Sequence, residues 1–295
     1  MNSKPVVAIL GLGKMGSAIA KELSAAGVTL QLWNRSQATT DQLVDQLQSA
    51  NVRACVTAGE AIDGADFALC TFANGAVTYA TLIEDASTLE KAKPALIVAD
   101  LGTSGVDVAR KLATELTQRK IRFIDAPVSG SMATIASHQL LVMASGQREV
   151  VDEIAPVLMH FSKKVAYLGE AGSGQVMKLA VNLIVHTLDA AVAESLALAA
   201  KGGVTPEAAY DVFDESVIAA PFVKYKRDAF LNPEAPVAMR VDTVSKDLGL
   251  ITNLGVTLGV PLAVTEAVKG LFAQAQAAGF AERDMARIVE FLQKL

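Results

Sequence analysis

The sequence predicts an α/β fold in which an amino-terminal Rossmann domain with a doubly wound sheet is joined by a long interdomain helix to an all-α carboxy-terminal domain. An apolar, strand-like run at residues 6–10 leads directly into G-x-G-x-x-G, and a helical pattern follows at once. Strand and helix patterns then alternate as far as residue 168. Strand patterns stop after that point, and residues 175–200 contain neither Pro nor Gly.

Apolar runs and helical periodicity place the elements of the first domain in order. Helical patterns cover residues 14–26, a segment from about residue 37, and residues 106–119. Strand patterns cover residues 28–33, 52–56, 67–71, 95–100, 122–128, 140–144 and 164–168. This alternation is typical of a parallel sheet with right-handed crossovers.

The unbroken stretch at residues 175–200 predicts a helix of roughly 26 residues, about 40 Å long. The segment is apolar on nearly every face, so we expect it to be buried on most sides. It would leave the first domain and form the core of the second, shared with a partner subunit. Thr205-Pro206-Glu207 then begins a further helix. We place the domains at residues 1–164 and 165–295.

The composition restricts the class of protein. The chain of 295 residues is 52% hydrophobic, enough for two domain cores. Its formal net charge of −5 argues against nucleic acid as a partner. No uncharged apolar run reaches the roughly 20 residues of a membrane span. The two cysteines, Cys55 and Cys70, and the three histidines lack the spacing of metal ligands, so we expect no metal, buried thiols and a cytoplasmic location.

The glycine-rich loop has the pattern of a dinucleotide site. Gly11 permits the tight turn, Gly13 lets the backbone approach a pyrophosphate, and Gly16 lets the following helix pack close to the strand. Leu12 and Met15 complete the loop. The phosphates would then lie against N–H groups at the amino end of a helix.

The end of the second strand pattern indicates which dinucleotide binds. An NAD site usually has Asp or Glu about 20 residues after the glycines. This chain has Asn34, followed by Arg35 and Ser36. A guanidinium pairs with a 2′-phosphate, which a carboxylate would repel, so we predict NADP(H). The alternative is that Arg35 is a solvated loop residue.

Lys178 and Asn182 are the candidate catalytic pair. They are spaced i and i+4 on the long helix, so both side chains lie on one face. The surrounding residues are apolar, and a desolvated lysine with a lowered pKa is a suitable proton donor for an alkoxide. Asn182 would orient the lysine or hold a substrate oxygen. The alternative is a lysine that extends to solvent.

A second candidate region is the segment Asp125-Ala126-Pro127-Val128-Ser129-Gly130-Ser131, at the end of a strand. Ligands of open α/β sheets bind beyond the carboxyl ends of strands, and Ser129, Gly130 and Ser131 offer donors for a carboxylate. The alternative is an ordinary tight turn. His186, two turns after Lys178, either lines a pocket or packs between helices, and His138 lies in a loop near the predicted crevice.

Together these residues resemble the β-hydroxyacid dehydrogenase family along essentially the whole chain. Four ordered segments carry the resemblance: Gly11–Gly16, Asp125–Gly130, Gly172 to Asn182, and Lys246-Asp247-Leu248. The resemblance implies that Lys178 is catalytic, that Ser129, Gly130, Asn182 and Lys246 contact substrate, and that Thr103 contacts the nicotinamide. It also implies a homodimer or homotetramer built on the carboxy-terminal helices.

The chain departs from the family pattern at two places, and two alternative functions stay open. Ser131 replaces a glycine of the family pattern, and His138-Gln139-Leu140 replaces G-T-L. Both changes favour a semialdehyde, glyoxylate or another small carbonyl over 3-hydroxyisobutyrate. Imine reductases share the architecture but usually have Asp or Tyr where this chain has Lys178. A catalytically silent, NADP-binding regulatory protein is the nonenzymatic alternative.

Overall fold

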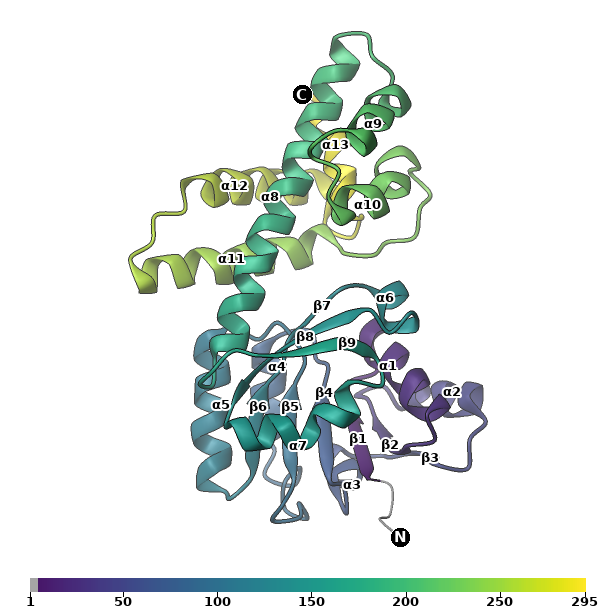
Figure 1. Cartoon of the computed structure of the whole chain (residues 1–295), viewed down its shortest axis with the longest axis vertical. Coiled ribbons are helices and arrows are strands. Elements are labelled where there is room, and N and C mark those ends of the chain that lie inside the picture. The colour runs from purple at the N-terminus through teal and green to yellow at the C-terminus, as the bar shows by residue number, and fades with distance from the viewer. Residues whose placement is uncertain (1–4) are drawn as a thin grey trace. The chain divides into compact units, whose positions relative to one another are not determined.

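The computed structural model of the protein describes residues 5–295, which divide into two compact units, Met1–Lys178 and Leu179–Leu295. The first unit is a layered α/β structure and the second is helical (Figure 1). The division falls inside one continuous helix, α8 (Ser173–Lys201). The predicted fold class is confirmed.

Among residues 5–295, nine strands form the sheet in the order β3-β2-β1-β4-β5-β6-β8-β7, with β9 paired to β8. Strands β1 to β6 pair in parallel, as predicted, and the strand order reverses between β1 and β4. The far edge differs from the prediction, because β8 runs antiparallel to β6 and β7. The strands are β1 (Val6–Leu10), β2 (Thr29–Trp33), β3 (Val52–Ala54), β4 (Phe67–Cys70), β5 (Ile97–Asp100), β6 (Arg122–Asp125), β7 (Val128–Ser129), β8 (Leu140–Gly146) and β9 (Ser162–Tyr167).

The strand predicted at residues 122–128 is broken in two. β6 ends at Asp125 and β7 begins at Val128. Pro127 has no N–H to donate to a ladder, so the strand is interrupted there, although the Pro127 carbonyl still accepts a hydrogen bond from the Met143 N–H of β8 at 2.9 Å. β6 and β7 pair with β8 in one antiparallel register, so Ser129 follows the line of β6 along β8.

Helices cover both faces of this sheet, and alternate side chains of each strand supply the two cores. Val7 and Ile9 of β1 pack in one core, and Ala8 and Leu10 pack in the other. The first core is covered by α1 (Lys14–Ala25), α2 (Gln37–Leu47), α6 (Met132–Ala136) and α7 (Arg148–Leu158). The second is covered by α3 (Ala58–Ile62), α4 (Gly75–Tyr79), the π-helix η1 (Ala80–Glu84) and α5 (Val106–Gln118). The elements α3, α4, η1 and α6 have five residues each, too few for the periodicity that predicts a helix.

The second unit is built around α8. This helix has 29 residues, and it is the one described helix that is long and apolar enough to cross a membrane by length and composition. Core helices of soluble proteins pass the same test. The helix predicted after Thr205 is present, with the Thr205 hydroxyl accepting a hydrogen bond from the Ala208 N–H at 3.3 Å. The remaining elements are α9 (Pro206–Glu215), α10 (Pro221–Leu231), α11 (Val241–Leu258), α12 (Ala263–Ala275), the π-helix η2 (Gln276–Phe280), the 3-10 helix η3 (Met285–Arg287) and α13 (Ile288–Lys294).

Candidate cofactor and catalytic site

The glycine-rich loop joins β1 to α1 at the point where the strand order reverses. Gly11 has a φ of 95°, in the left-handed region that favours glycine. A Cβ on Gly16 would overlap the Gly11 carbonyl and the Thr71 hydroxyl, so only glycine lets α1 approach this closely. Thr71 itself donates to the Gly11 carbonyl at 2.6 Å. Thr71 was not among the predicted site residues, although a hydroxyl directly after a buried strand is the signal that could have identified it.

The amino end of α1 is suited to an anionic ligand. Apart from Gly13 itself and its chain neighbours, no heavy atom of residues 5–295 lies within 4 Å of the position that a Cβ on Gly13 would occupy. No side chain caps the helix at Gly13. An uncapped helix start beside an accessible backbone is the arrangement that binds pyrophosphate. The residues Gly11, Leu12, Gly13, Met15 and Gly16 therefore fit a bound dinucleotide.

The segment after β2 contacts this loop through Asn34. The Asn34 Oδ1 accepts a hydrogen bond from the Leu12 N–H at 3.1 Å, which fixes the distance between the two loops. Arg35 and Ser36 are exposed beside it.

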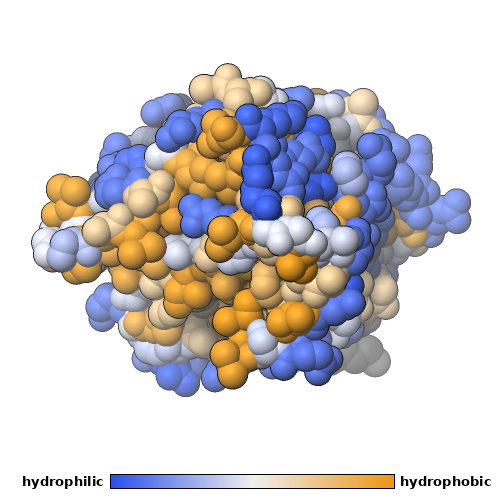
Figure 2. All heavy atoms as spheres, turned by 90° about the horizontal axis from the view of Figure 1, so that it is seen from above, coloured by the Kyte–Doolittle hydropathy of each residue, from blue (hydrophilic) through white to orange (hydrophobic). Residues whose placement is uncertain are grey.

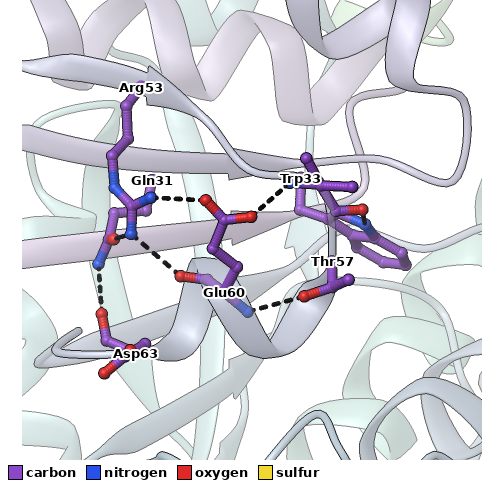
Figure 3. A network of polar contacts seen from close by, with 7 residues as sticks. Gln31, Trp33, Arg53, Thr57, Glu60 and Asp63 are labelled. Atoms are coloured by element: carbon purple, nitrogen blue, oxygen red, sulfur yellow. Dashed lines mark hydrogen bonds and ion pairs between the residues drawn. The ribbon is translucent and has the colours of Figure 1, made fainter.

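A second arginine in this region, Arg53 of β3, is already engaged. Its guanidinium donates to the Glu60 carboxylate at 2.9 Å, to the Glu60 carbonyl at 3.1 Å and to the Gln31 side chain (Figure 3). These partners hold Arg53 between β2 and α3. Arg35 is therefore the better placed of the two for an anionic group of a ligand.

The loop after β5 carries Thr103 and is held by a residue at the start of α8. The Gln175 Oε1 accepts hydrogen bonds from the N–H groups of Ser104 and Gly105 at 3.1 and 3.2 Å, and its Nε2 donates to the Gly102 carbonyl at 2.9 Å. Gln175 is fully buried. Gln175 was not among the predicted site residues. The signal that could have identified it is a single amide side chain within the apolar start of the long helix.

Asp125 anchors the start of the same helix. Its Oδ1 accepts from the Gly172 N–H at 2.7 Å and the Ser145 hydroxyl at 2.5 Å, and its Oδ2 accepts from the Gln175 N–H at 2.9 Å. Burial raises the pKa of Asp125, while these donors act in the opposite direction. The first residue of the D-A-P-V-S-G segment therefore supports the helix that carries Lys178.

Gly172 and Gly174, which precede Lys178, belong to the same close packing of the start of α8 against the first unit. A Cβ on Gly174 would lie 2.5 Å from the Met143 carbonyl and 2.7 Å from the Asp125 carboxylate, and Gly172 has a φ of 94°. The close approach is therefore to strands of the protein itself.

One hydrogen-bond donor of the loop after β7 is already engaged within the loop itself. The Ser131 N–H donates to the Thr134 hydroxyl at 2.7 Å, so it is not available to a carboxylate. The side chains of Ser129 and Ser131 are half-buried and Gly130 is exposed. His138 has a φ of 55°, which explains why glycine suits this position in the pattern that the chain resembles. Its Nε2 lies 2.9 Å from the Glu22 carboxylate of α1.

The remaining predicted residues lie on α8 and α11. Lys178 is half-buried in the second turn of α8, and Asn182, one turn further on, is buried in the second unit. The Asn182 Nδ2 donates to the Asp247 Oδ2 at 2.7 Å, and the Lys246 Nζ lies 3.1 Å from the Asp247 Oδ1. The structure thus brings Asn182 and Lys246 together around the buried Asp247 carboxylate. From the sequence, Asp247 could be recognised only as the neighbour of Lys246 in a common Lys-Asp pair.

Other reactive groups are not gathered into a site. Cys55 and Cys70 are free and buried as predicted, and burial raises the pKa of Cys55 to about 11. Over residues 5–295, no cluster of three or more His, Cys, Asp or Glu side chains could hold a metal ion. Two surface cavities of about 320 and 390 Å³ lie elsewhere on the first unit, and none of the predicted site residues lines them.

Comparisons with known proteins agree with this arrangement. Residues 6–169 match the family described as the NAD binding domain of 6-phosphogluconate dehydrogenase, and residues 172–292 match the family described as NAD-binding of NADP-dependent 3-hydroxyisobutyrate dehydrogenase. Glyoxylate/succinic semialdehyde reductase 1 of Arabidopsis thaliana is 28% identical over 284 residues, which cover 96% of this chain and 97% of that protein.

Two solved structures show the same fold. A 3-hydroxyisobutyrate dehydrogenase from Salmonella typhimurium is 26% identical with a TM-score of 0.89, covering 98% of this chain and 100% of that one. An imine reductase from Myxococcus stipitatus in complex with NADP+ is 18% identical with a TM-score of 0.67, over 98% and 100% of the two chains. The chain therefore belongs to the β-hydroxyacid dehydrogenase family and is an NAD(P)-binding oxidoreductase.

Proposed function

We propose that this protein uses NADPH to reduce a small aldehyde or keto acid of the semialdehyde or glyoxylate type, in a reversible reaction with Lys178 as general acid and base. The observation that carries the proposal is the position of Lys178. It is half-buried one turn before Asn182, on a helix whose start is fixed by Asp125 and Gln175. Similarity to a glyoxylate/succinic semialdehyde reductase over nearly the whole chain supports the substrate class.

The proposed mechanism assigns a role to each group. Gly11–Gly16, Asn34, Arg35, Ser36, Thr103 and Lys246 hold the cofactor, and bound NADPH supplies the hydride. Lys178 donates a proton to the carbonyl oxygen as it becomes an alkoxide, and takes the proton back in the oxidative direction. Asn182 orients the amine or holds a substrate oxygen. Ser129, Gly130, Ser131 and Lys246 bind the substrate carboxylate.

The preference for NADP(H) rests on the residues after β2. Arg35 is exposed beside the loop that fits the pyrophosphate, whereas Arg53 is engaged by Glu60 and Gln31. No carboxylate stands at position 34 to repel a 2′-phosphate. These features favour NADP(H) on electrostatic grounds.

A panel of carbonyl and imine substrates tests the reaction class. Purified protein with NADPH is assayed for loss of NADPH absorbance with succinic semialdehyde, glyoxylate and a cyclic imine. We expect turnover of at least one of the two carbonyl compounds and much slower turnover of the imine. Faster imine reduction would favour the imine reductase alternative. NADPH binding without any turnover would favour the regulatory one.

Substitution of Lys178 tests the proton transfer. Lys178→Ala should bind NADPH as the wild type does while kcat falls by a factor of about 10² to 10⁴, the usual contribution of a positioned acid or base. Lys201→Ala, at the exposed end of the same helix, is the matched control and should keep wild-type turnover. Near-normal turnover in Lys178→Ala would refute the assigned role.

We also propose that the protein is a cytoplasmic homodimer or homotetramer. Large apolar side chains are exposed along α8 (Ile184, Leu198) and around the α11–α12 turn (Val256, Leu258, Val260, Val264). Figure 2 shows apolar surface of this kind interspersed with polar side chains on one face of the molecule. A second copy of the chain would remove these side chains from water. Two free thiols accord with a reducing compartment.

A further inference from the structure

A fully buried histidine faces the Asp247 carboxylate from α8. The His186 Nε2 lies 3.6 Å from the Asp247 Oδ2, and neither ring nitrogen has a hydrogen-bond partner among the described residues. An imidazole carries at least one N–H, and burying that donor without an acceptor is unfavourable. The distance is slightly too long for a hydrogen bond, so a small movement of the ring would give His186 its acceptor.

The same carboxylate determines which way the Asn182 amide faces. A carboxylate only accepts hydrogen bonds, so the group 2.7 Å from the Asp247 Oδ2 must be the NH₂ of Asn182. The Asn182 Oδ1 is then directed away from Asp247 as an acceptor. Lys178 lies one turn earlier on the same face of α8. In this orientation Asn182 can accept a hydrogen bond from an ammonium or a substrate hydroxyl, and it cannot use the same NH₂ to hold a carbonyl.

Asp247 can fix Asn182 only if its own carboxylate is held. Lys246 lies 3.1 Å from the Oδ1, but its side chain is 29% exposed, so water competes for the ammonium. The Oδ2 has two lone pairs and can accept from Asn182 and His186 together. His186 belongs to α8 and Asp247 to α11, so their contact also joins the two helices that carry Asn182 and Lys246.

We propose that His186 is a positioning residue, which holds Asp247 so that Asp247 keeps the Asn182 amide with its Oδ1 toward the Lys178 turn. His186 itself touches neither cofactor nor substrate in this proposal. The expected effect on turnover rests on the reductase activity proposed above. The orientation of the Asn182 amide is independent of that activity.

Two substitutions separate positioning from packing. His186→Leu removes the donor and keeps an apolar volume, so kcat should fall about tenfold while the KM for NADPH stays unchanged. His186→Gln restores an NH₂ group near Asp247 and should recover most of kcat. Thr187→Val, which removes another buried hydroxyl without a partner from α8, is the matched control and should be neutral. Wild-type kcat in His186→Leu, or equal losses in the Leu and Gln variants, would overturn the proposal.

The side-chain amide of Asn182 gives a readout that needs no turnover. Its ¹⁵N–¹H resonances, assigned by comparison with Asn182→Ala, should shift in His186→Leu and stay in place in Thr187→Val. Unchanged resonances in His186→Leu would refute the positioning role whatever the activity. If the wild type is inactive on the whole panel and the resonances still shift, the proposed function fails and the positioning role stands.

Discussion

The two arginines near the ends of β2 and β3 differ in how much of their hydrogen-bonding capacity remains. Arg53 is shared between Gln31 and Glu60, whereas Arg35 is exposed beside the glycine-rich loop. A guanidinium with unoccupied donors binds a phosphate through two parallel hydrogen bonds. In our proposal, the preference for NADP(H) over NAD(H) therefore depends on Arg35.

Arg35→Asp tests this dependence. The new carboxylate would repel the 2′-phosphate, so the KM for NADPH should rise at least tenfold while the KM for NADH changes little. Steady-state kinetics with both cofactors measure the two effects. Lys163→Asp, an exposed charge reversal on β9, controls for net charge and should leave both constants unchanged. Equal effects of Arg35→Asp on NADPH and NADH would contradict the assignment.

Asp189 is a fully buried carboxyl group of α8. Within the part of the chain that the structure describes, neither of its oxygens has a hydrogen-bond partner, and burial raises its pKa to about 8 although Lys226 acts to lower it. Lys226 is paired with Asp284 at 2.6 Å. Between the ordinary Asp pKa of about 4 and the folded pKa of about 8, the folded protein holds a proton that the unfolded chain releases. Stability must therefore fall as the pH rises through this interval.

Asp189→Asn removes the titration and keeps the size of the side chain. The melting temperature of the variant should exceed that of the wild type by an amount that grows between about pH 4 and pH 8. Thermal unfolding followed by circular dichroism at several pH values measures the difference. Asp228→Asn, on the exposed side of α10, should show no such trend. A difference independent of pH would mean that Asp189 is not protonated in the folded protein.

At the residue scale, residues whose role is local could be predicted from the sequence. Residues whose role depends on partners far away in the chain could not. Gly11 and Gly16 could be predicted because a tight turn and a close helix have a fixed spacing. Gln175 could not, because its partners are some 70 residues earlier in the chain. Asp247 was seen only as one member of a common pair, since its burial beside Asn182 depends on how α8 and α11 pack.

At the element scale, the start of α8 connects the sheet to Lys178, the residue to which we assign the proton transfer in our proposal. Asp125 of β6 accepts hydrogen bonds from Gly172, Gln175 and Ser145, and Ser145 of β8 accepts from Gly174. These bonds satisfy N–H groups that a helix leaves without partners at its amino end. The position of Lys178 therefore depends on two strands as well as on its own helix.

Asp125→Ala should be strongly destabilising for this reason. It leaves three buried donors without an acceptor, at about 1–3 kcal/mol each. Trp33 is the only tryptophan and lies in the first unit, so its fluorescence in urea reports the free energy of unfolding of that unit. Asp152→Ala, which breaks an exposed i,i+4 pair with Arg148, should change this free energy by less than about 0.5 kcal/mol. Similar values for the two variants would show that Asp125 does not anchor α8.

Most elements could be predicted from the sequence because their patterns are long. The helices α1, α5 and α8 and the buried parallel strands agree with the predictions to within a few residues. The antiparallel direction of β8 was not visible, since strand pairing is decided by tertiary contacts and not by periodicity. Short helices such as α6 depend on single contacts, here between Ser131 and Thr134.

At the scale of the whole molecule, α8 combines a buried polar face with exposed apolar side chains. Asn182, His186 and Asp189 recur at helical spacing and are buried, whereas Ile184 and Leu198 are exposed. Only 33% of its most apolar 18-residue window is buried within the chain. We expected a helix buried on most sides, so a second copy of the chain is the covering that this surface requires in our proposal.

The α11–α12 turn offers the sharpest test of that assembly. Val256 and Val264 are 82% and 64% exposed, so Asp at both positions should leave the isolated fold intact. A two-fold interface repeats each substitution, and every buried valine replaced there loses roughly 1.5–3 kcal/mol of apolar burial besides adding a desolvated charge. The double variant should therefore have the 30.8 kDa mass of a single chain in light scattering, while the wild type has two or four times that mass. Val217→Asp, an exposed valine outside this turn, should assemble normally. A wild type that is already a single chain, or a double variant that still assembles, would show that these side chains are not the interface.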